Sequence, residues 1–404
     1  MTDISVSVEF NVTRSPNLTY LGRCSRPFII IRVNNTKVIN SCQEAENIVE
    51  LNYDSGTRSL CSLARMTLVD IMKIRTSLEN LENYRVYLKV EEAVYEFFKR
   101  KGYLKVDLPV LSPALIPESY LEVFETEFRL SWEKTCLPAG REKLYLTPSP
   151  ELFLKRLLMA GVGNCYYLGK SFRNSEPNSS WHQPEFTMLE FYKLGVNYLE
   201  MADEVLELLC FIDSKVKRQK LKGKSSSQKL KFDRWEKYSV GQAFEKFAEI
   251  SKKELFDEKL FIKKIKNKGY KITGATYEDL FSQILAAEIE PKLGKNGRAT
   301  LLYDYPKQLA SLAKLSKDRK TAERCEFYID GLEVGGFCTE LNDYKEQEKR
   351  FFSQMVSHSI DKGFIEALKY GLPNCTGAGI GFERLVMTLT NVKSIDKLKL
   401  INIK

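Results

Sequence analysis

The dipeptide Asp330-Gly331 is the feature that most limits how this chain can fold. It separates two runs in which apolar and polar residues alternate. Asp-Gly in that context is typical of a two-residue turn between antiparallel strands. We therefore expect a β-hairpin that begins with Ile329 opposite Leu332.

Two carboxylates share one face of this expected hairpin. Glu326 and Glu333 are diagonal neighbours in the register, with backbones roughly 7 to 8 Å apart. The other face carries only apolar side chains, namely Phe327, Ile329, Leu332 and Val334. A carboxylate pair at this spacing is suited to holding Mg²⁺ between the oxygens of a triphosphate. A hairpin with an ordinary polar, solvent-facing side is the alternative interpretation.

A second strand is expected after Pro184. Strand alternation places Phe186, Glu190 and Tyr192 on one face, together with Met188. A purine could stack on the ring of Phe186. A cationic side chain could be bound by Glu190 and Tyr192. This strand therefore predicts one face of a ligand site.

Two arginines stand in settings suited to phosphate. Arg173 follows Phe172, and Arg384 follows a run that contains Gly377, Gly379 and Gly381. Guanidinium groups neutralise and orient phosphates, and glycines let the backbone approach a ligand closely. Together these stretches indicate a site for a folded-back nucleoside triphosphate and an ATP-consuming ligase.

Composition bounds the class of protein. A chain of 404 residues is long enough for one catalytic domain and a small extra module. The formal charge of +9 suits a polyanion such as tRNA or an acidic protein, but a solvated lysine-rich surface explains it equally. Nine scattered cysteines and two histidines favour reduced thiols over disulfides or zinc. No apolar run reaches the ~20 residues that span a bilayer, so we expect a soluble, cytoplasmic protein.

We expect two domains. Residues 1–80 carry short β-type runs and predict a small β-rich module, either a shortened OB-like barrel or a structural appendage. Residues 81–404 are expected to form the catalytic domain. Apolar spacing and turn signals predict helices at residues 84–98, 151–159, 199–211, 237–271 and 277–293, and a strand at residues 106–109.

With these residues assembled, the chain from about residue 84 to residue 398 resembles the catalytic domain of class II lysyl-tRNA synthetases. It is most similar to the elongation factor P lysyltransferases. Residues 106–112 are similar to motif 1, the stretch around Arg173 and Phe186 to motif 2, and residues 377–384 to motif 3. Residues 147–151 and 340–343 match further family signatures.

The resemblance implies an α+β fold with an antiparallel sheet flanked by helices, and a homodimer built through motif 1. It implies that Arg173 binds the α-phosphate of ATP and that Phe186 and Arg384 sandwich the adenine. It also implies that Glu326 and Glu333 bind Mg²⁺. The remaining implied ATP-site residues are His182, Glu185 and Gly381, and the implied amino-acid-site residues are Glu151, Glu190, Tyr192, Glu340 and Gly379.

The implied reaction joins lysine or β-lysine to ATP as an aminoacyl adenylate and then transfers it to an acceptor. The short N-terminal module favours a lysine of elongation factor P over tRNA, because a complete anticodon-binding module needs on the order of 100 residues. A compact lysyl-tRNA synthetase and a non-catalytic binding paralogue are the two alternatives. Gly379, often alanine in the protein-modifying branch, favours α-lysine and leaves β-lysine open.

Three positions depart from the family pattern. Gly336 stands where asparagine is usual, and Cys338 stands where an aromatic residue is usual. The loop of residues 175–181 lacks the arginine that commonly precedes His182 and helps bind the γ-phosphate; Lys170 is a candidate substitute. We therefore expect the fold to follow the family pattern more closely than the amino-acid pocket does.

Overall fold

The computed structural model describes residues 31–33, 37–39, 74–114, 122–129, 141–174, 179–217, 230–353 and 361–403. The chain divides into two compact units, Met1–Lys73 and Ile74–Lys404. In the first unit, strands β1 (Ile31–Val33) and β2 (Lys37–Ile39) pair antiparallel. The rest of that unit lies outside the described residues, so the β-rich module of residues 1–80 stays a prediction.

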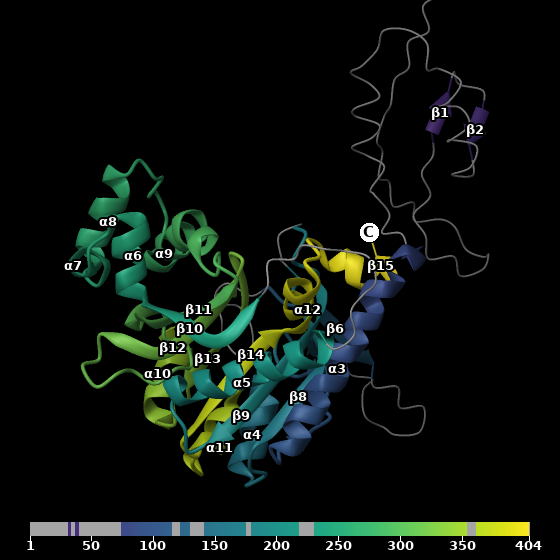
Figure 1. The fold of residues 1–404 in the computed structure, drawn as a ribbon, viewed down its shortest axis with the longest axis horizontal. Helices are drawn as coiled ribbons and strands as arrows, with labels where there is room; N and C mark the ends of the chain where they lie inside the picture. Colours follow the sequence, from purple (N-terminus) through teal and green to yellow (C-terminus); the bar gives the residue numbers. More distant parts are fainter. Residues whose placement is uncertain are drawn as a thin grey trace, which may run out of the picture. The chain divides into compact units, whose positions relative to one another are not determined.

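The second unit is built on an eight-stranded sheet, which Figure 1 shows flanked by helices. The strand order is β10-β11-β12-β13-β14-β9-β8-β4. All neighbours from β11 to β8 pair antiparallel, and only the two outermost pairs are parallel. The bounds are β4 (Leu104–Lys105), β8 (Cys165–Phe172), β9 (Glu185–Leu194), β10 (Lys231–Ser239), β11 (Arg298–Pro306), β12 (Thr321–Ile329), β13 (Leu332–Thr339) and β14 (Cys375–Gly381). The expected α+β fold is confirmed.

Three helices cover one face of this sheet. They are α3 (Leu81–Arg100), α5 (Tyr198–Lys217) and α12 (Phe382–Thr390). The helices predicted at residues 84–98 and 199–211 lie inside α3 and α5. Their apolar stripes pack on Leu189, Phe327 and Ile380 of the sheet to form the main core. Burial of this face fixes which strand residues point the other way, toward the candidate site.

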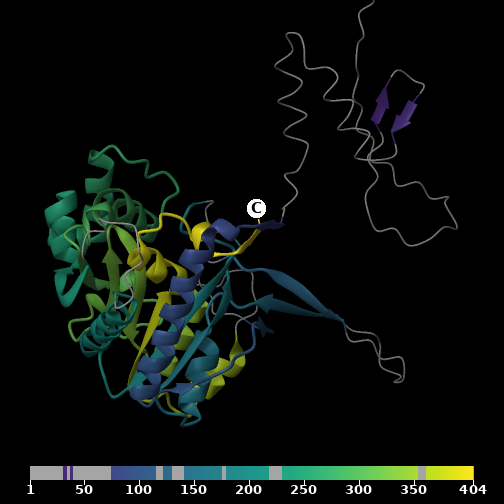
Figure 2. The same ribbon diagram turned by 45° about the vertical axis from the view of Figure 1, so that its right-hand side comes forward.

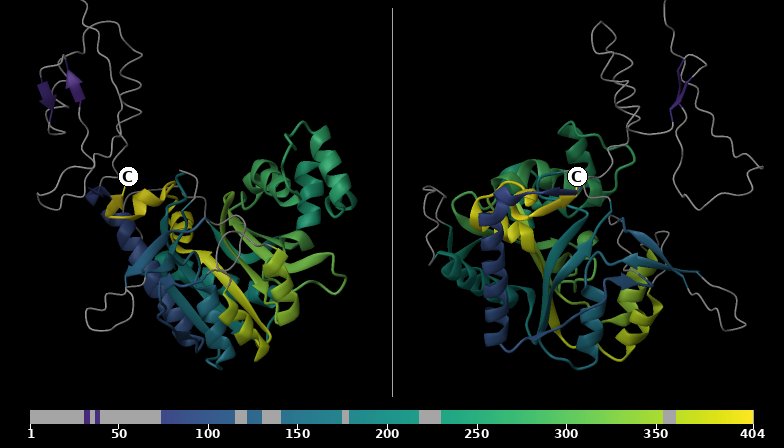
Figure 3. Two further views of the ribbon diagram at one scale, coloured as in Figure 1. Left: turned by 180° about the vertical axis from the view of Figure 1, so that it is seen from behind. Right: turned by 90° about the vertical axis from the view of Figure 1, so that its right-hand side faces the viewer.

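A helical subdomain covers part of the opposite face. It comprises α6 (Val240–Ala248), α7 (Lys252–Leu255), α8 (Glu258–Asn267) and α9 (Tyr277–Ile284), followed by a π-helical turn (Leu285–Ile289) and a 3₁₀ turn (Glu290–Lys292). These helices share a separate core with Leu302, Tyr305 and Tyr328 of the sheet. Figure 3 shows this subdomain, in green, far from α3, in blue.

The single helix predicted at residues 237–271 is wrong. Residues up to Ser239 belong to β10, and Ser239 then caps α6. The chain leaves α6 at Glu249, which has φ of 54°. A new capping box at Ser251 starts α7, because its hydroxyl accepts a hydrogen bond from the Glu254 N–H. By contrast, the helix predicted at 277–293 is present in α9 and the two turns that follow it.

A second helical layer covers the same face nearer to β8 and β9. It consists of α4 (Glu151–Met159), α10 (Tyr344–Ser353) and α11 (Lys362–Lys369). Its core includes Tyr167 and Tyr192 of the sheet. The helix predicted at residues 151–159 is confirmed. The strip of sheet between this layer and the helical subdomain carries the candidate site.

The strand predicted at residues 106–109 is wrong. Strand β4 ends at Lys105, and the next strand, β5 (Leu111–Ser112), joins a separate three-stranded sheet with β7 (Arg141–Leu146) and β6 (Glu125–Arg129). Pro109 has no N–H to donate, which prevents a continuous ladder here. Figure 2 shows β6 and β7 extending away from the large sheet.

The C-terminal segment returns to the start of the second unit. A 3₁₀ turn (Ile395–Leu398) leads to β15 (Ile401–Ile403), which pairs antiparallel with β3 (Ile74–Thr76). Asn80 donates hydrogen bonds from its amide to the Asp396 and Lys399 carbonyls at 2.7 and 2.8 Å. Among the described residues, no helix combines the length and the apolar composition needed to cross a bilayer.

Candidate active site

A row of four paired residues crosses the centre of the sheet on its second face. Glu326 of β12 lies opposite Gly336 of β13, Gly336 lies opposite Gly379 of β14, and Gly379 lies opposite Glu190 of β9. Adjacent strands are about 4.8 Å apart, so the two glutamate backbones are separated by roughly 14 Å. The two glycines between them leave a floor without side chains, which we call the glycine floor.

The hairpin that carries the first carboxylates has the expected turn and an unexpected bulge. Ile329 pairs with Leu332 and Tyr328 with Glu333, as predicted. The register then shifts, because Phe327 pairs with Gly335. A bulge of this kind adds one residue to one strand and bends it. Val334 is buried in the main core, and the face predicted to be apolar is confirmed as such.

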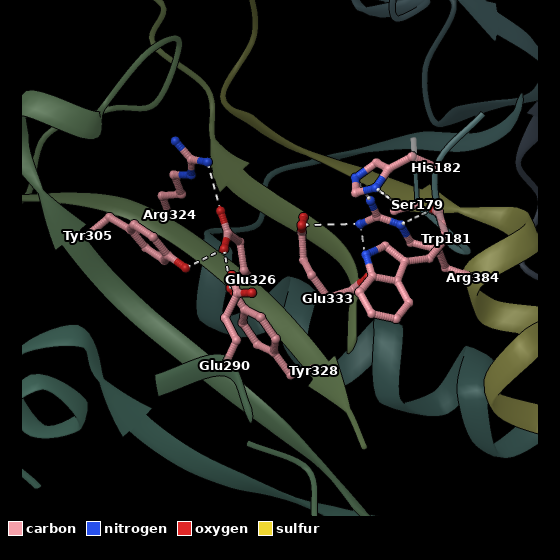
Figure 4. Close-up of polar contacts among 10 residues, drawn as sticks. All are labelled: Ser179, Trp181, His182, Glu290, Tyr305, Arg324, Glu326, Tyr328, Glu333 and Arg384. Atoms are coloured by element: carbon pink, nitrogen blue, oxygen red, sulfur yellow. Dashed lines mark hydrogen bonds and ion pairs between the residues drawn. The ribbon is translucent and has the colours of Figure 1, made fainter. Parts of the chain in front are cut away.

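Glu326 is buried and strongly held. Its carboxylate accepts hydrogen bonds from Tyr305 OH at 2.5 Å and Tyr328 OH at 2.7 Å. Arg324 donates to the other oxygen at 2.8 Å. Figure 4 shows these three donors around Glu326. Arg324 also stacks on the Tyr305 ring, with 5.0 Å from the guanidinium carbon to the ring centroid. Sequence reasoning missed Arg324, although its spacing of two residues from Glu326 on an expected strand was a usable signal.

Glu333 completes the predicted pair. Its pKa is raised, first by burial and then by the negative charge of Glu326. Arg384, Arg173 and Arg324 act in the opposite direction and lower this pKa. Because these effects require proximity, both predicted arginines lie within electrostatic reach of Glu333.

A third carboxylate, Glu290, comes from the 3₁₀ turn at the end of the helical subdomain. Its pKa is raised to about 7 by burial, then by Glu333 and Glu326. Tyr328 OH lies 3.5 Å from its Oε1. Sequence reasoning missed Glu290, because tertiary packing alone brings it to a hairpin about 40 residues later.

These carboxylates fit a divalent ion only in part. Within the ranges that the structure describes, no three histidine, cysteine or acidic side chains are arranged to enclose a metal. Mg²⁺ usually binds through one or two carboxylates and completes its shell with water and phosphate oxygens. Glu326 and Glu333 therefore suit Mg²⁺ that arrives with a triphosphate.

Arg384 is held at the other end of the carboxylate pair, as Figure 4 shows. It lies in the first turn of α12 and donates to Glu333 Oε2 at 3.2 Å and to the Glu333 carbonyl at 3.1 Å. It also contacts His182 Nε2 at 2.7 Å and the Trp181 carbonyl at 3.4 Å. Arginine has no acceptor atom, so His182 Nε2 accepts. The proton of neutral His182 is then on Nδ1, which donates to Ser179 Oγ at 2.6 Å.

The side chains of Arg173 and Phe186 contact each other in the candidate site. The Arg173 guanidinium carbon lies 5.2 Å from the centroid of the Phe186 ring, a cation–π distance. Glu185, next to Phe186, forms an ion pair of 3.1 Å with Lys170. Trp181 is 46% exposed and stands at the position where the resembled family has its arginine.

Glu190 is buried at the other end of the glycine floor. It accepts hydrogen bonds from Ser149 Oγ at 2.8 Å and from Tyr192 OH at 3.1 Å. Its pKa is raised to about 8, first by burial and then by the charge of Glu151. A carboxylate held in this way is suited to an ammonium group, which would restore its charged form.

Glu151 and Glu340 lie beside Glu190 and share one ammonium. Lys155 Nζ is 2.5 Å from Glu151 Oε1 and 2.5 Å from Glu340 Oε2. The pKa of Glu340 is raised to about 7. Burial is the largest cause, Lys155 acts against it, and the charge of Glu151 adds to it. Sequence reasoning missed Lys155, although its spacing of four residues from Glu151 on a helix was a usable signal. Counted as fully ionised, this pocket holds three carboxylates and one ammonium.

The three glycines of β14 that were singled out in the sequence differ in the space around them. A Cβ atom at Gly377 would lie 2.4 Å from Tyr192 Cε1 and 2.5 Å from Glu340 Oε1, so only glycine fits there. A Cβ atom at Gly379 would lie 3.7 Å from Met188 Sδ and 4.0 Å from Glu190 Oε2, so alanine would fit without rearrangement. At Gly381 it would meet only the side chain of Arg384, at 3.4 Å.

The two departures on β13 open one wall of the pocket. A Cβ atom at Gly336 would be 3.1 Å from the Cys325 carbonyl, so a larger residue there would require a small backbone shift. Cys338 Sγ lies 3.8 Å from Glu340 Oε1, in the place where the resembled family has an aromatic ring. The structure thus brings the predicted residues of motifs 2 and 3 to one face of the sheet, in two groups separated by the glycine floor, whereas the motif 1 stretch leads into the separate three-stranded sheet.

Comparison with known proteins gives the family. Residues 68–401 match the family described as tRNA synthetases class II (D, K and N). A protein of Buchnera aphidicola subsp. Schizaphis graminum named "Elongation factor P--(R)-beta-lysine ligase" is 32% identical over 321 residues, which cover 77% of this chain and 92% of that protein. A protein of the same name from Yersinia enterocolitica is 34% identical over 318 residues, covering 75% and 89%. Each of these two matches spans most of this chain and most of the relative. The family match, residues 68–401, contains the sheet, the hairpin and the arginines described above. This chain therefore belongs to the class II tRNA synthetase family of the D, K and N type.

Proposed function

We propose that this protein uses ATP to activate lysine or β-lysine as an aminoacyl adenylate and transfers it to a lysine of elongation factor P. The curated relatives carry the name of a ligase that joins (R)-β-lysine to elongation factor P. Family membership supports ligase chemistry, and the two groups of side chains support a nucleotide half and an amino-acid half.

The charge of the amino-acid half carries the proposal. Glu190 has neutral donors only, and Lys155 compensates one of the two charges on Glu151 and Glu340. Counted as fully ionised, the pocket thus carries two negative charges more than the cations of the protein compensate. Buried charges need partners, so the ligand should bring two ammonium groups. Lysine and β-lysine both do.

We assign the ATP half as follows. Arg173 binds the α-phosphate, and the adenine lies between Phe186 and Arg384. His182 keeps Arg384 in place, while Glu185 and Gly381 line the same half. Glu326 and Glu333 would hold Mg²⁺, which would neutralise charge on the phosphates when bound.

Activation then depends on placement. The amino acid lies along the glycine floor, with its side-chain ammonium at Glu190 and Tyr192 and its other ammonium at Glu151 and Glu340. Its carboxylate oxygen attacks the α-phosphorus, and pyrophosphate leaves. Positioning and charge neutralisation by Arg173 lower the barrier, and no protein nucleophile is required. A lysine amine of the acceptor then attacks the adenylate, and AMP leaves.

We also propose a homodimer through the motif 1 region. Leu104, Leu111 and Phe128 are large apolar residues that are 52%, 42% and 51% exposed. Exposed apolar side chains gathered near one stretch are typical of subunit contacts. Analytical ultracentrifugation should show a dimer, and Leu111→Asp should shift it toward the monomer.

Transfer experiments test the acceptor. Elongation factor P, the same factor with its target lysine changed to arginine, and tRNA should each be incubated with the enzyme, ATP and radiolabelled lysine or (R)-β-lysine. Label should appear on wild-type elongation factor P alone, and not on the lysine-to-arginine variant or on tRNA. Label on tRNA instead would support the compact synthetase, toward which the glycine at position 379 also points.

A further inference from the structure

The ammonium of Lys155 joins two elements that otherwise meet only at the amino-acid pocket. Glu151 and Lys155 lie one turn apart on α4, whereas Glu340 follows the end of β13. Lys155 is 2% exposed and lies 2.5 Å from a carboxylate oxygen on each side. The lysine therefore fixes the distance between two carboxylates that come from distant parts of the chain.

The second oxygen of Glu340 lies beside Gly377, which is two residues from Gly379 of the glycine floor and pairs with Tyr192. Glu340 Oε1 would lie 2.5 Å from a Cβ atom at Gly377, and Cys338 Sγ lies 3.8 Å from it. Lys155 Nζ lies 2.5 Å from the other oxygen, Oε2. One oxygen of Glu340 thus pairs with an ammonium of the protein, whereas the other has only a weak thiol donor.

Two carboxylates this close repel each other when both are charged, and a cation between them offsets that repulsion. The Glu340 side chain is 2% exposed and the Glu151 side chain 18% exposed, so water screens this repulsion little at Glu340. A protonated carboxyl group would be a weaker acceptor for a substrate ammonium. Counted as fully ionised, the two carboxylates and Lys155 together carry one negative charge, which matches one ammonium.

We propose that Lys155 is a positioning residue that sets the geometry and charge of this subsite, so that it accepts a single ammonium group of a diamino acid substrate. The inference rests on the function proposed above, because it assumes that an amino acid occupies the pocket. Lys155 itself does not contact the reacting atoms. It acts through Glu151 and Glu340.

The test compares amino-acid-dependent exchange of labelled pyrophosphate into ATP in wild-type protein and Lys155→Met. Methionine keeps an unbranched chain of similar length without the charge. The KM for the diamino acid should rise about 10-fold or more, with kcat and the KM for ATP within about 3-fold of wild type. Such a split separates lost substrate binding from lost catalytic power.

Lys193→Met is the matched control. Lys193 Nζ lies 2.6 Å from Glu204 Oε2, and the Glu204 side chain is 4% exposed. This variant also removes the nearest ammonium from a buried carboxylate, but outside the pocket, and Lys101 Nζ remains 3.8 Å from Glu204 Oε2. It should lower the melting temperature and leave the KM for the amino acid unchanged.

Chemical rescue covers the case in which Lys155→Met folds poorly. Lys155→Ala leaves a cavity, and propylammonium added to the assay should lower the raised KM several-fold by replacing the missing cation. Tetramethylammonium, which cannot donate a hydrogen bond, should not rescue.

Three results would overturn the inference. The first is an unchanged KM for the diamino acid in Lys155→Met. The second is a lower KM, which would mean that Lys155 competes with the substrate for the subsite. The third is equal rescue by propylammonium and tetramethylammonium. Absence of exchange in the wild-type protein with any diamino acid would instead refute the proposed function, so the two failures can be told apart.

Discussion

At the scale of single residues, the carboxylates of the site differ in how far donors of the protein itself compensate them. Glu326 has three donors from the protein, whereas Glu190 has only two hydroxyl groups. Glu326 is therefore held in place by donors of the protein itself, whereas Glu190 is suited to gain a cation. Both carboxylates were predicted from strand alternation. Lys155 and Glu290 were not, because their roles arise from packing between elements that are distant in sequence.

Removal of Glu333, one of the two carboxylates proposed to hold Mg²⁺, tests the nucleotide half. Glu333→Ala should reduce pyrophosphate exchange by at least about 1,000-fold, since charge neutralisation of this kind contributes several kcal/mol to the barrier. Circular dichroism and the melting temperature should stay near wild type. Glu366→Ala, which removes an exposed carboxylate paired with Lys369, is the control. Exchange close to wild type in Glu333→Ala would refute the metal assignment.

The raised pKa of Glu190 predicts how stability depends on pH. Its pKa is about 8 in the folded protein against an ordinary 4.5, so the folded state keeps a proton that the unfolded state releases. Stability without ligand should fall as pH rises from about 4.5 to 8, by at most about 1.4 kcal/mol per pH unit from this group. Thermal unfolding at several pH values should show a shallower decline in Glu190→Gln. An identical slope would contradict the pKa shift.

At the scale of elements, the ATP half depends on the C-terminal segment. The Ile395 N–H donates to the Ser180 carbonyl at 2.8 Å, and Gln183 Nε2 donates to Asp396 Oδ1 at 2.7 Å. The segment thus fixes the loop that presents His182 to Arg384. The strand after Pro184 was predicted from the sequence but this contact was not, because hydrogen bonds across more than 200 residues leave no local pattern. The error at residues 237–271 is of another kind: the capping boxes at Ser239 and Ser251 are local signals, and they outweighed a continuous helical pattern.

Loss of this contact should weaken ATP binding. Asp396→Ala should raise the KM for ATP roughly 3- to 10-fold, since one buried hydrogen bond contributes about 1 kcal/mol, and leave the KM for the amino acid unchanged. Steady-state exchange at varied ATP measures this. The control is Asp257→Ala, which removes the cap of α8 through the bond to the Leu260 N–H and should lower stability alone. A similar rise in the KM for both substrates would show a general loss of folding instead.

At the scale of the whole molecule, a sheet with one covered face supplies the site. Alternation along β9 and the hairpin turn at Asp330-Gly331 predicted which residues would share a face, and the structure agrees. The bulge that places Glu326 opposite Gly336, and hence in a row with Gly379 and Glu190, could not be predicted, because the position of a bulge depends on packing against the helices. This row of paired residues joins the nucleotide half and the amino-acid half into one surface.

The most direct test of the central claim asks whether the pocket requires two ammonium groups. Pyrophosphate exchange should be measured with lysine, (R)-β-lysine and norleucine, which has the length of lysine but lacks its side-chain ammonium. We predict exchange with at least one of the two diamino acids and at least about 100-fold lower kcat/KM for norleucine, because Glu190 would be left buried without a cation. Comparable exchange with norleucine, or none with either diamino acid, would contradict the account.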